Sequence, residues 1–271
     1  MTNIRKAGKD MNKRQPINAE KDLIRIMSSN ILAVQSDSET IIPKRIRATS
    51  MCAHYLTYQP DLLGLQEVQA DTKELMCSLL SDLYTMVNAD TDGQKNYTPI
   101  FYKTDKFELL DSKFHSFIKK GLWHYVWALY RRRSDGKRVI HMNLHYHYSA
   151  TEARLPEAKT VNAELKRLCE EYPDAAIFVT GDYNCETFTP EFAAMLEGLP
   201  MDTAMRLTED NDGFEVGWHH PDTTEYVGEG AIDHICVTYE KAAVVRHRKI
   251  RSELLTYSTD HDPVYIDVRL V

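Results

Sequence analysis

The chain has 271 residues, a formal net charge of -7 and a hydrophobic fraction of 43%. This length is enough for one domain with a sizeable core, and the composition is that of an ordinary globular protein. The negative charge weighs against a protein that holds long nucleic acid on a broad basic face. No run of about 18 apolar residues is present, so no membrane span is predicted.

The N-terminal residues and the cysteines indicate a cytoplasmic protein. Residues 1–22 are polar, lack the apolar stretch of a signal peptide, and are expected to form a flexible tail before one domain over 23–271. The five cysteines are odd in number and lack zinc-like spacing, which is typical of reduced, buried thiols. Nothing in the chain indicates an obligate protein partner.

The first part of the domain alternates short apolar runs with helical patterns. Residues 23–27 and 62–65 predict strands. The spacing of apolar residues over 42–56 predicts a helix, and a second helix is expected over about 70–81.

The middle of the chain is rich in aromatic strands. Strands are predicted over 97–102, 107–117, 124–131 and 139–145. Asp135-Gly136 predicts the hairpin turn that precedes the last of them.

Helices and strands also share the remainder of the chain. Residues 151–171 give the clearest helical pattern, and Thr189-Pro190 predicts an N-cap followed by proline at the first helical position. The glycine-containing stretch 207–230 is predicted to be a loop. Further strands are expected over 175–180, 232–238, 243–248 and 264–270. Strict alternation of strand and helix is absent, which favours one α+β domain over a Rossmann-type sheet.

Polar residues stand where most of these strands end or begin. They are Asn30, Glu67, His145, Asp182, Asn184, Asp233, His234, Asp260 and His261. Each alone has a plainer explanation. Asparagine after a strand is typical of a turn, and alternating polar residues, here His141, Asn143, His145 and His147, are typical of a half-exposed sheet face. Together they indicate polar groups that converge on one rim of a sheet, where ligands bind.

These residues lie in segments that resemble the endonuclease/exonuclease/phosphatase superfamily. The matching segments are Met27-Ser-Ser-Asn30-Ile-Leu, Leu65-Gln-Glu67, Asn143-Leu-His145, Gly181-Asp-Tyr-Asn184, Ile232-Asp-His-Ile235 and Ser258-Thr-Asp-His-Asp-Pro263. Their order and spacing agree with the family over about residues 23–271. The resemblance implies an α+β fold, a four-layer αββα sandwich of two mainly antiparallel sheets face to face with helices outside.

The resemblance also implies a metal-dependent phosphoesterase that uses Mg²⁺, with Mn²⁺ as the alternative ion. Glu67 is then the principal metal ligand, Asn30 supports it through its amide oxygen or a bound water, and Asp260 is the second carboxylate. Mg²⁺ prefers oxygen ligands and keeps several waters, so one or two carboxylates are enough.

The same resemblance assigns the catalytic groups. Asp182 takes the position of the general base for a water nucleophile, and Asn184 holds that water or a phosphate oxygen. His145 and His261 are expected on either side of the phosphate as hydrogen-bond donors. Asp233 is the expected partner of His261, fixing its tautomer and orientation.

Four features depart from patterns found within the family, and three of them narrow the substrate class. Ala33 stands where the AP endonucleases of the family carry an acid, which argues against abasic-site repair. The region 229–235 lacks the arginine of the inositol-phosphate 5-phosphatases, which argues against inositol phosphates. Leu144 stands where the family usually has a threonine, directly before His145, and this departure is minor. No long aromatic hairpin typical of the sphingomyelinases is found.

Substrate choice is therefore expected to depend on loops. Asn96 and Tyr97 precede a strand in a region where relatives contact their ligands, and Trp218 and His219 lie on the long loop before Ile232. An aromatic residue in a loop is more often a packing anchor than a ligand contact, so packing is the alternative explanation for Trp218.

Three functions stay open at this point. The first is a phosphodiesterase or phosphatase acting on a small organophosphate, a nucleotide or a nucleic-acid end. The second is a deoxyribonuclease-like endonuclease on DNA or RNA, which the acidic charge disfavours. The third is a catalytically inactive binding module, disfavoured because the set of acids, amides and histidines is complete.

Overall fold

The computed structural model describes most of the predicted domain. The described residues are 22–33, 36, 39–118, 123–148, 151–212, 218–219, 226–227 and 230–271. All of the expected N-terminal tail except Asp22 lies outside them.

The first of two six-stranded sheets contains both ends of the folded domain. In spatial order its strands are β13 (Ala242–Lys249), β14 (Val264–Leu270), β1 (Ile24–Asn30), β2 (Leu62–Gln66), β4 (Ile100–Tyr102) and β3 (Thr85–Met86). The central neighbours β1 and β2 are parallel, and the other adjacent strands are antiparallel.

The second sheet repeats this arrangement. Its order is β5 (Phe107–Ser116), β6 (His124–Arg132), β7 (Arg138–His145), β8 (Ala176–Asp182), β12 (Asp233–Thr238) and β9 (Met201–Thr203). Again the central pair, β7 and β8, is parallel while the other neighbours are antiparallel. Each sheet therefore has one parallel pair at its centre.

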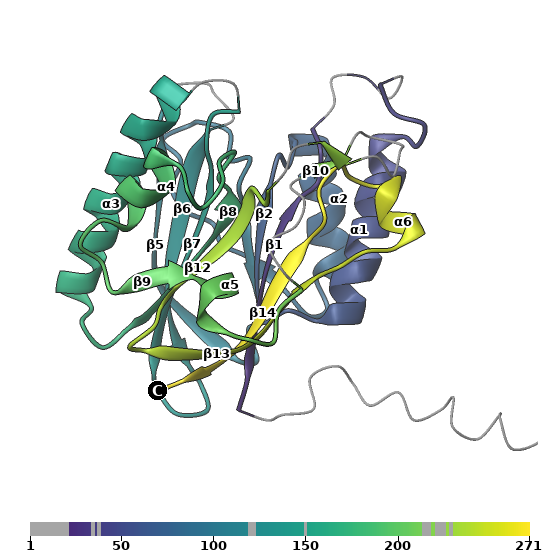
Figure 1. Ribbon diagram of the computed structural model, residues 1–271. Helices are drawn as coiled ribbons and strands as arrows, with labels where there is room; N and C mark the ends of the chain where they lie inside the picture. Colours follow the sequence, from purple (N-terminus) through teal and green to yellow (C-terminus); the bar gives the residue numbers. More distant parts are fainter. Residues whose placement is uncertain are drawn as a thin grey trace, which may run out of the picture.

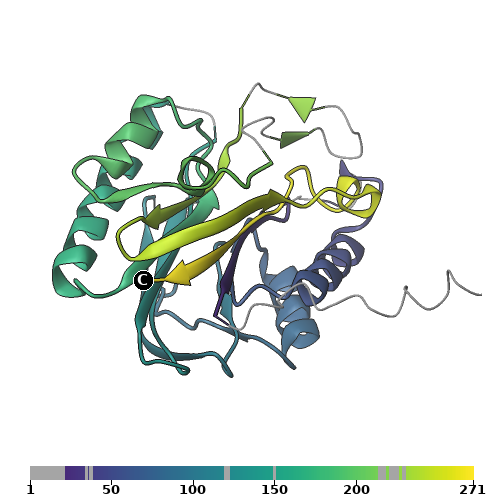
Figure 2. The ribbon, with the colours of Figure 1, turned by 60° about the horizontal axis from the view of Figure 1, so that its bottom comes forward.

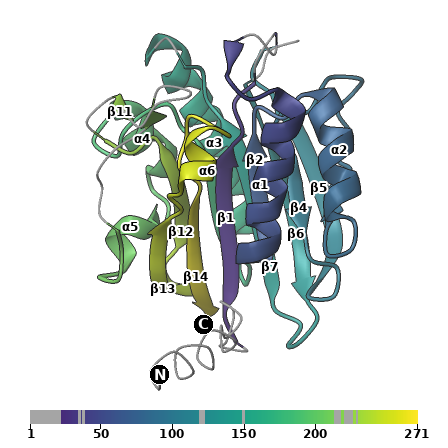
Figure 3. The same cartoon turned by 90° about the vertical axis from the view of Figure 1, so that its right-hand side faces the viewer.

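Helices cover the outer face of each sheet (Figures 1, 2 and 3). The helices are α1 (Lys44–Tyr58), α2 (Ala70–Leu80), α3 (Thr151–Glu171), α4 (Pro190–Leu196), α5 (Ala204–Leu207) and α6 (Glu253–Thr256). The first two lie on the sheet that contains β1, and α3 and α4 lie on the other. The predicted four-layer αββα sandwich is thus confirmed.

Three apolar layers hold these elements together. Residues such as Val126, Phe178 and Ile266 fill the space between the two sheets. Separate clusters pack α3 and α4 on one sheet and α1 and α2 on the other, with Leu165 and Met51 among their fully buried members. Burial of apolar surface at about 25 cal/mol per Å² makes these layers the main stabilising contribution to the fold.

Local sequence signals fixed several boundaries correctly. The helix predicted over 151–171 is α3. At the start of α4 the hydroxyl of Thr189 accepts a hydrogen bond from the amide of Phe192 at 3.4 Å, with Pro190 in the first helical turn. No helix in the described part of the chain is both long and apolar enough to cross a membrane.

Two predictions need correction. The stretch 207–230 is not loop throughout, because β10 (Trp218–His219) pairs with β11 (Tyr226–Val227). Strands of two residues are too short to show a period. The strand expected from Tyr97 begins only at Ile100, because the amides of Tyr97 and Thr98 donate to the ring nitrogen Nε2 of His124.

A buried polar cluster joins the inner faces of the two sheets. Gln66 on β2 donates to Asn143 Oδ1 on β7 at 2.7 Å, and Thr180 on β8 donates to the same oxygen at 2.9 Å. His141 Nε2 lies 2.8 Å from the Thr180 hydroxyl. His141 and Asn143 are fully buried, so the alternative of a half-exposed sheet face is wrong.

Gly64 on β2 is required by this cluster. A Cβ at this position would lie 2.2 Å from Thr180 Oγ1 and 2.5 Å from Asn143 Oδ1. We expect Gly64→Ala to force the sheets apart locally and to lower the free energy of unfolding by about 1–3 kcal/mol, as overpacking does. Urea denaturation measures the change, with exposed Ser78→Ala as the control. An unchanged urea midpoint would show that the two sheets do not meet here.

His141 makes stability depend on pH. Burial lowers the pKa of His141 to about 3 from 6.5. The unfolded chain therefore binds a proton that the folded chain excludes, so this stabilising contribution is complete above about pH 6.5 and is lost as pH falls. Relative to His141→Gln, the wild type should lose an additional ~1.4 kcal/mol per pH unit between about pH 6 and 4. Equal slopes in urea titrations at several pH values would contradict this.

Candidate functional site

The two parallel strand pairs deliver polar residues to the same end of the sandwich. Asn30 ends β1 opposite Gln66, the last residue of β2, and Glu67 directly follows Gln66 in the chain. His145 ends β7 opposite Asp182, which ends β8. Since parallel strands end on the same edge, each sheet brings two functional side chains to that edge.

The antiparallel neighbours add residues from their starting ends. Asp233 begins β12 opposite Asp182. Asp260 and His261 precede β14, which runs antiparallel to β1. The Thr259 hydroxyl donates to the carbonyl of Asn30 at 2.7 Å and fixes this segment against the end of β1. Six chain segments therefore meet here, as the strand-end pattern predicted.

Asn30 connects the two sheets through its side chain. Its amide nitrogen Nδ2 donates to Glu67 Oε1 and to Asp182 Oδ2, each at 3.0 Å. Its oxygen Oδ1 accepts from the amide of Leu32 at 2.9 Å, and the amide of Ala33 donates to Glu67 Oε2 at 2.6 Å. In this arrangement the Asn30 amide orients two carboxylates, and its oxygen is turned to the backbone rather than to a metal.

The backbone around these carboxylates is strained. Leu32, Glu67 and Asn184 have φ values of 59°, 64° and 48°, in the left-handed region that side chains with a Cβ rarely adopt. Such residues cost about 1–3 kcal/mol each and persist where the surroundings hold them. Here the strain turns the chain sharply after β1, β2 and β8, which places the side chains at the rim.

His261 and Asp233 form a buried pair. His261 Nδ1 lies 2.7 Å from Asp233 Oδ2, the contact that the sequence predicted. Burial opposes a charge on the imidazole, yet Asp233, Asp182 and Asp260 together hold the pKa of His261 well above its usual value. Burial raises the pKa of Asp233 to about 6. The neighbouring acids therefore favour the imidazolium form of His261, whose Nε2 lies 3.8 Å from Asp182 Oδ2.

His145 approaches the same carboxylates from the other side. Its Nε2 lies 3.5 Å from Asp182 Oδ2 and 3.8 Å from Glu67 Oε1. The side chain is 3% exposed, so its ring is fixed by packing rather than by solvent. Asp182 thus lies between two histidines, His145 and His261.

Asn184 is held by the strand end that it follows. Its backbone amide donates to Asp182 Oδ1 at 2.9 Å, and its side-chain nitrogen donates to the carbonyl of Tyr146 at 2.9 Å. One Asp182 oxygen is thereby anchored, while the other, Oδ2, faces Asn30 and both histidines.

The cluster fits a hard divalent cation. Potential ligand atoms of Glu67, His145 and Asp182 lie within 4.8 Å of one another, and so do those of Asp182, Asp233 and His261. Burial raises the pKa of Asp260, and its buried Oδ1 has no hydrogen-bond partner among the described residues. Buried carboxylates so close together repel one another, and a cation held by oxygen ligands would offset that repulsion.

The predicted substrate residues divide into two groups. Asn96 and Tyr97 lie beside the site, because the Tyr97 amide donates to His124 Nε2 at 2.9 Å and His124 pairs with His145 across β6 and β7. Trp218 and His219 form β10, but their side chains lie outside the described part of the chain.

His124 is a residue that the sequence analysis missed. It is fully buried, and burial lowers its pKa to about 3. The neutral ring accepts hydrogen bonds from two successive amides, those of Tyr97 and Thr98. The sequence shows only a histidine at the start of a strand, so only the pairing with His145 could reveal this position.

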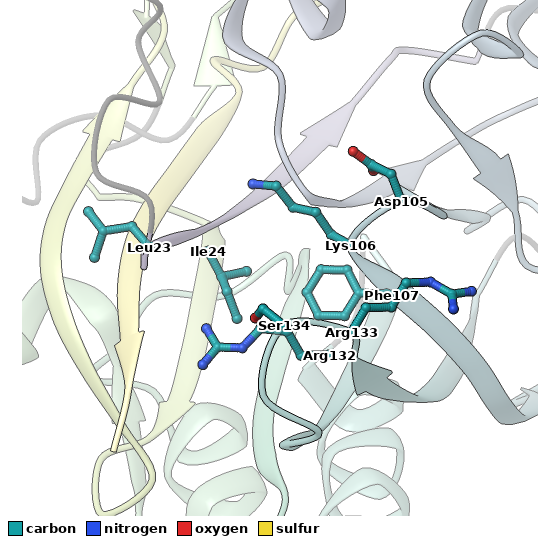
Figure 4. A pocket seen from close by; sticks show the side chains of 8 residues that line it. All are labelled: Leu23, Ile24, Asp105, Lys106, Phe107, Arg132, Arg133 and Ser134. Atoms are coloured by element: carbon teal, nitrogen blue, oxygen red, sulfur yellow. The ribbon is translucent and has the colours of Figure 1, made fainter.

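A cavity of about 280 Å³ lies at the opposite end of the sandwich (Figure 4). It is lined by residues from the start of β1 and from the turns around β5 and β6. Lys106 at this cavity pairs with buried Asp61 at 2.8 Å, and Arg132 pairs with Asp135. Because β1 starts here and ends at Asn30, this cavity is separate from the carboxylate cluster.

Known structures share this architecture. An endonuclease/exonuclease/phosphatase from Bacteroides vulgatus aligns with a TM-score of 0.78 at 20% identity, covering 93% of this chain and 100% of that one. A Bacteroides thetaiotaomicron mannosyl-6-phosphatase aligns with a TM-score of 0.76 at 20% identity, covering 92% of this chain and 99% of that one. D. rerio TDP2 complexed with single strand DNA product gives 0.72 at 19%, covering 91% and 99%.

The chain has the endonuclease/exonuclease/phosphatase fold. No family model and no curated protein matches the sequence. Since identities near 20% show the fold alone, the activity has to be argued from the residues of this chain.

Cation binding should stabilise the protein through Glu67. A cation that binds only the folded state at about 100 times its Kd adds about 2.7 kcal/mol, or roughly 5–10 °C in Tm. We expect Mg²⁺ or Mn²⁺ to produce such a rise, and Glu67→Gln to reduce it by removing one negative ligand. Thermal unfolding with and without each ion measures both. Glu240→Gln, an exposed acid beyond β12, is the matched control. An equal rise in Tm in the Glu67→Gln variant would show that Glu67 is not a metal ligand.

Proposed function

We propose that this protein is a Mg²⁺-dependent phosphoesterase that hydrolyses a phosphodiester or phosphomonoester by attack of water. The observation that carries the proposal is the position of Asp182. One buried carboxylate contacts Asn30 at 3.0 Å and lies within 4 Å of both His145 and His261. A base flanked by two donors beside a set of carboxylates is the arrangement that hydrolysis of an anionic ester requires.

Glu67 and Asp260 would hold the metal ion in this proposal. When bound, the ion neutralises charge on the phosphoryl and leaving oxygens. Asn30 fixes the Glu67 carboxylate by donating to Oε1, while the Ala33 amide fixes the other oxygen. Both ligand oxygens are thus positioned before any ion arrives, which lowers the entropic cost of binding.

Asp182 would take the proton from the attacking water. Its Oδ1 accepts a hydrogen bond from the Asn184 amide and its Oδ2 accepts one from Asn30 Nδ2, so the second lone pair of Oδ2, on the side of the histidines, would take the proton. The Asn184 side chain adds a polar group without adding negative charge, which suits a site for an anion. A positioned general base typically contributes about 10²–10⁴-fold in rate.

His261 and His145 would stabilise the negative charge that develops on the phosphoryl group. Asp233 fixes His261 through Nδ1, so that its Nε2–H faces the site. Each donor aimed at the transition state contributes about 3–4 kcal/mol in comparable enzymes.

The substrate class proposed is a small organophosphate, a nucleotide or a nucleic-acid end. Similar structures include a mannosyl-6-phosphatase and a TDP2 with a single strand DNA product, so the fold accommodates both kinds of ligand. The net charge of -7 favours a short substrate over a long polyanion. The alternative, an endonuclease on DNA or RNA, predicts nicking of a supercoiled plasmid.

The test is hydrolysis of bis-p-nitrophenyl phosphate, followed by a panel of phosphoesters. We expect turnover with Mg²⁺ or Mn²⁺ that a chelator abolishes. Asp182→Asn keeps the shape of the side chain but removes the base, so kcat should fall by about 10²–10⁴-fold while KM changes only a few-fold.

The control for this variant is Asp105→Asn, an exposed acid at the opposite end of the sandwich. It should keep full activity. A fully active Asp182→Asn protein would show that the base is wrongly assigned. A wild-type protein that turns over no member of the panel would favour the binding-module alternative.

A further inference from the structure

Three aromatic rings gather beside His145. Trp123 and His147 are stacked, with ring centroids 3.9 Å apart and an interplanar angle of 29°. Tyr148 is nearly parallel to His147, at 5.4 Å and 8°, and lies 6.1 Å from Trp123. We call these three residues the aromatic platform.

The platform lies close to His145, the histidine of the proposed catalytic site. His147 follows His145 by two residues, a span of at most about 7 Å between Cα atoms. Trp123 precedes His124, which pairs directly with His145 across β6 and β7. These two connections place the platform beside His145, and His145 Nε2 lies 3.5 Å from Asp182 Oδ2, at the proposed phosphate site.

Hydrogen bonds hold the platform in place. The backbone amide of His147 donates to Glu157 Oε2 at 2.9 Å. Arg154 on α3 donates to the carbonyls of His147 and Tyr148 at 3.2 and 3.3 Å. The amide of Tyr146 donates to the carbonyl of Asp182 at 3.1 Å, which ties the loop to the strand of the proposed base. A pre-organised loop binds a ligand without the cost of ordering itself.

Tyr148 is also open to solvent. Its exposed fraction is 69%, although its ring lies against His147 and Trp123 and its backbone carbonyl accepts a hydrogen bond from Arg154. An exposed flat ring at the end of a supported stack is suited to stacking against another flat ring.

We propose that the platform of Trp123, His147 and Tyr148 stacks a nucleobase of the substrate. This inference rests on the proposed function, because it assigns the organic group attached to the phosphate. Stacking of a base on an aromatic side chain contributes about 1–3 kcal/mol and tolerates different bases. A sugar phosphate without a base would occupy the phosphate site but leave the platform bare.

The kinetic test compares substrates that differ only in the base. A thymidine dinucleotide is matched with an analogue in which one base is replaced by hydrogen, and AMP is matched with ribose 5-phosphate. Tyr148→Ala should lower kcat/KM for the base-containing member by about 5–150-fold and leave the base-free member unchanged. Tyr148→Phe, which keeps the ring, should retain wild-type values.

The matched control is Tyr239→Ala. This tyrosine is 49% exposed and follows β12 at the end opposite to Asp233. This variant should leave kcat/KM unchanged for all members of both substrate pairs. If Tyr148→Ala leaves the preference for base-containing substrates intact, or if none exists, the platform has no role in recognition, while the phosphoesterase assignment still stands.

A binding test separates this inference from the hydrolytic one. Saturation-transfer NMR with adenosine and with ribose needs neither metal nor turnover. We expect transfer to the base protons of adenosine in the wild type, reduced in Tyr148→Ala, and little transfer to ribose. That result in a protein that hydrolyses nothing would support the platform and overturn the proposed function. Equal transfer from wild type and Tyr148→Ala would overturn the platform.

Discussion

The hydrogen bonds of Asn30 are the interaction on which the site depends. One amide nitrogen donates to Glu67 from its own sheet and to Asp182 from the opposite sheet. The carboxylates of Glu67 and Asp182, which would otherwise repel each other, are thereby held next to each other at a fixed separation. Directly beneath, Gln66 and Asn143 join the same two sheets, so the geometry of the site is fixed by the contact between sheets rather than by loops.

This contact depends on the parallel pair at the centre of each sheet. In each pair, the two strands end side by side, and the strained residues Glu67 and Asn184 follow those ends. An antiparallel meander would send alternate strand ends to opposite edges. The parallel pairs instead concentrate acids and histidines at one edge, where their charges act on each other and on a ligand.

Burial and charge oppose each other throughout the site. Burial alone would favour the neutral forms of Asp233 and His261, yet their 2.7 Å contact and the neighbouring acids raise the pKa of the imidazole. Asp260 is less well compensated, because its buried Oδ1 has no hydrogen-bond partner in the described part of the chain and lies 4.0 Å from His261 Nε2. The excess of acids is the physical reason to expect a cation, and the stacked rings of Trp123, His147 and Tyr148 are the reason to propose that a flat ring binds next to it.

Local patterns in the chain predicted most of its elements and a group of polar residues at strand ends, whereas the four layers were implied by the family resemblance. Apolar periods located most helices and strands, and polar residues at strand ends pointed to Asn30, Glu67, Asp182 and His261, because these are local properties of the chain. Only the tertiary structure decided which strands are neighbours. His124 pairs with His145, and Trp123 stacks on His147, across a strand register that no local pattern encodes. The alternating polar residues of β7 could not be interpreted from the sequence for the same reason. A strand shows the same alternation of two residues whether water or a second sheet covers its polar face.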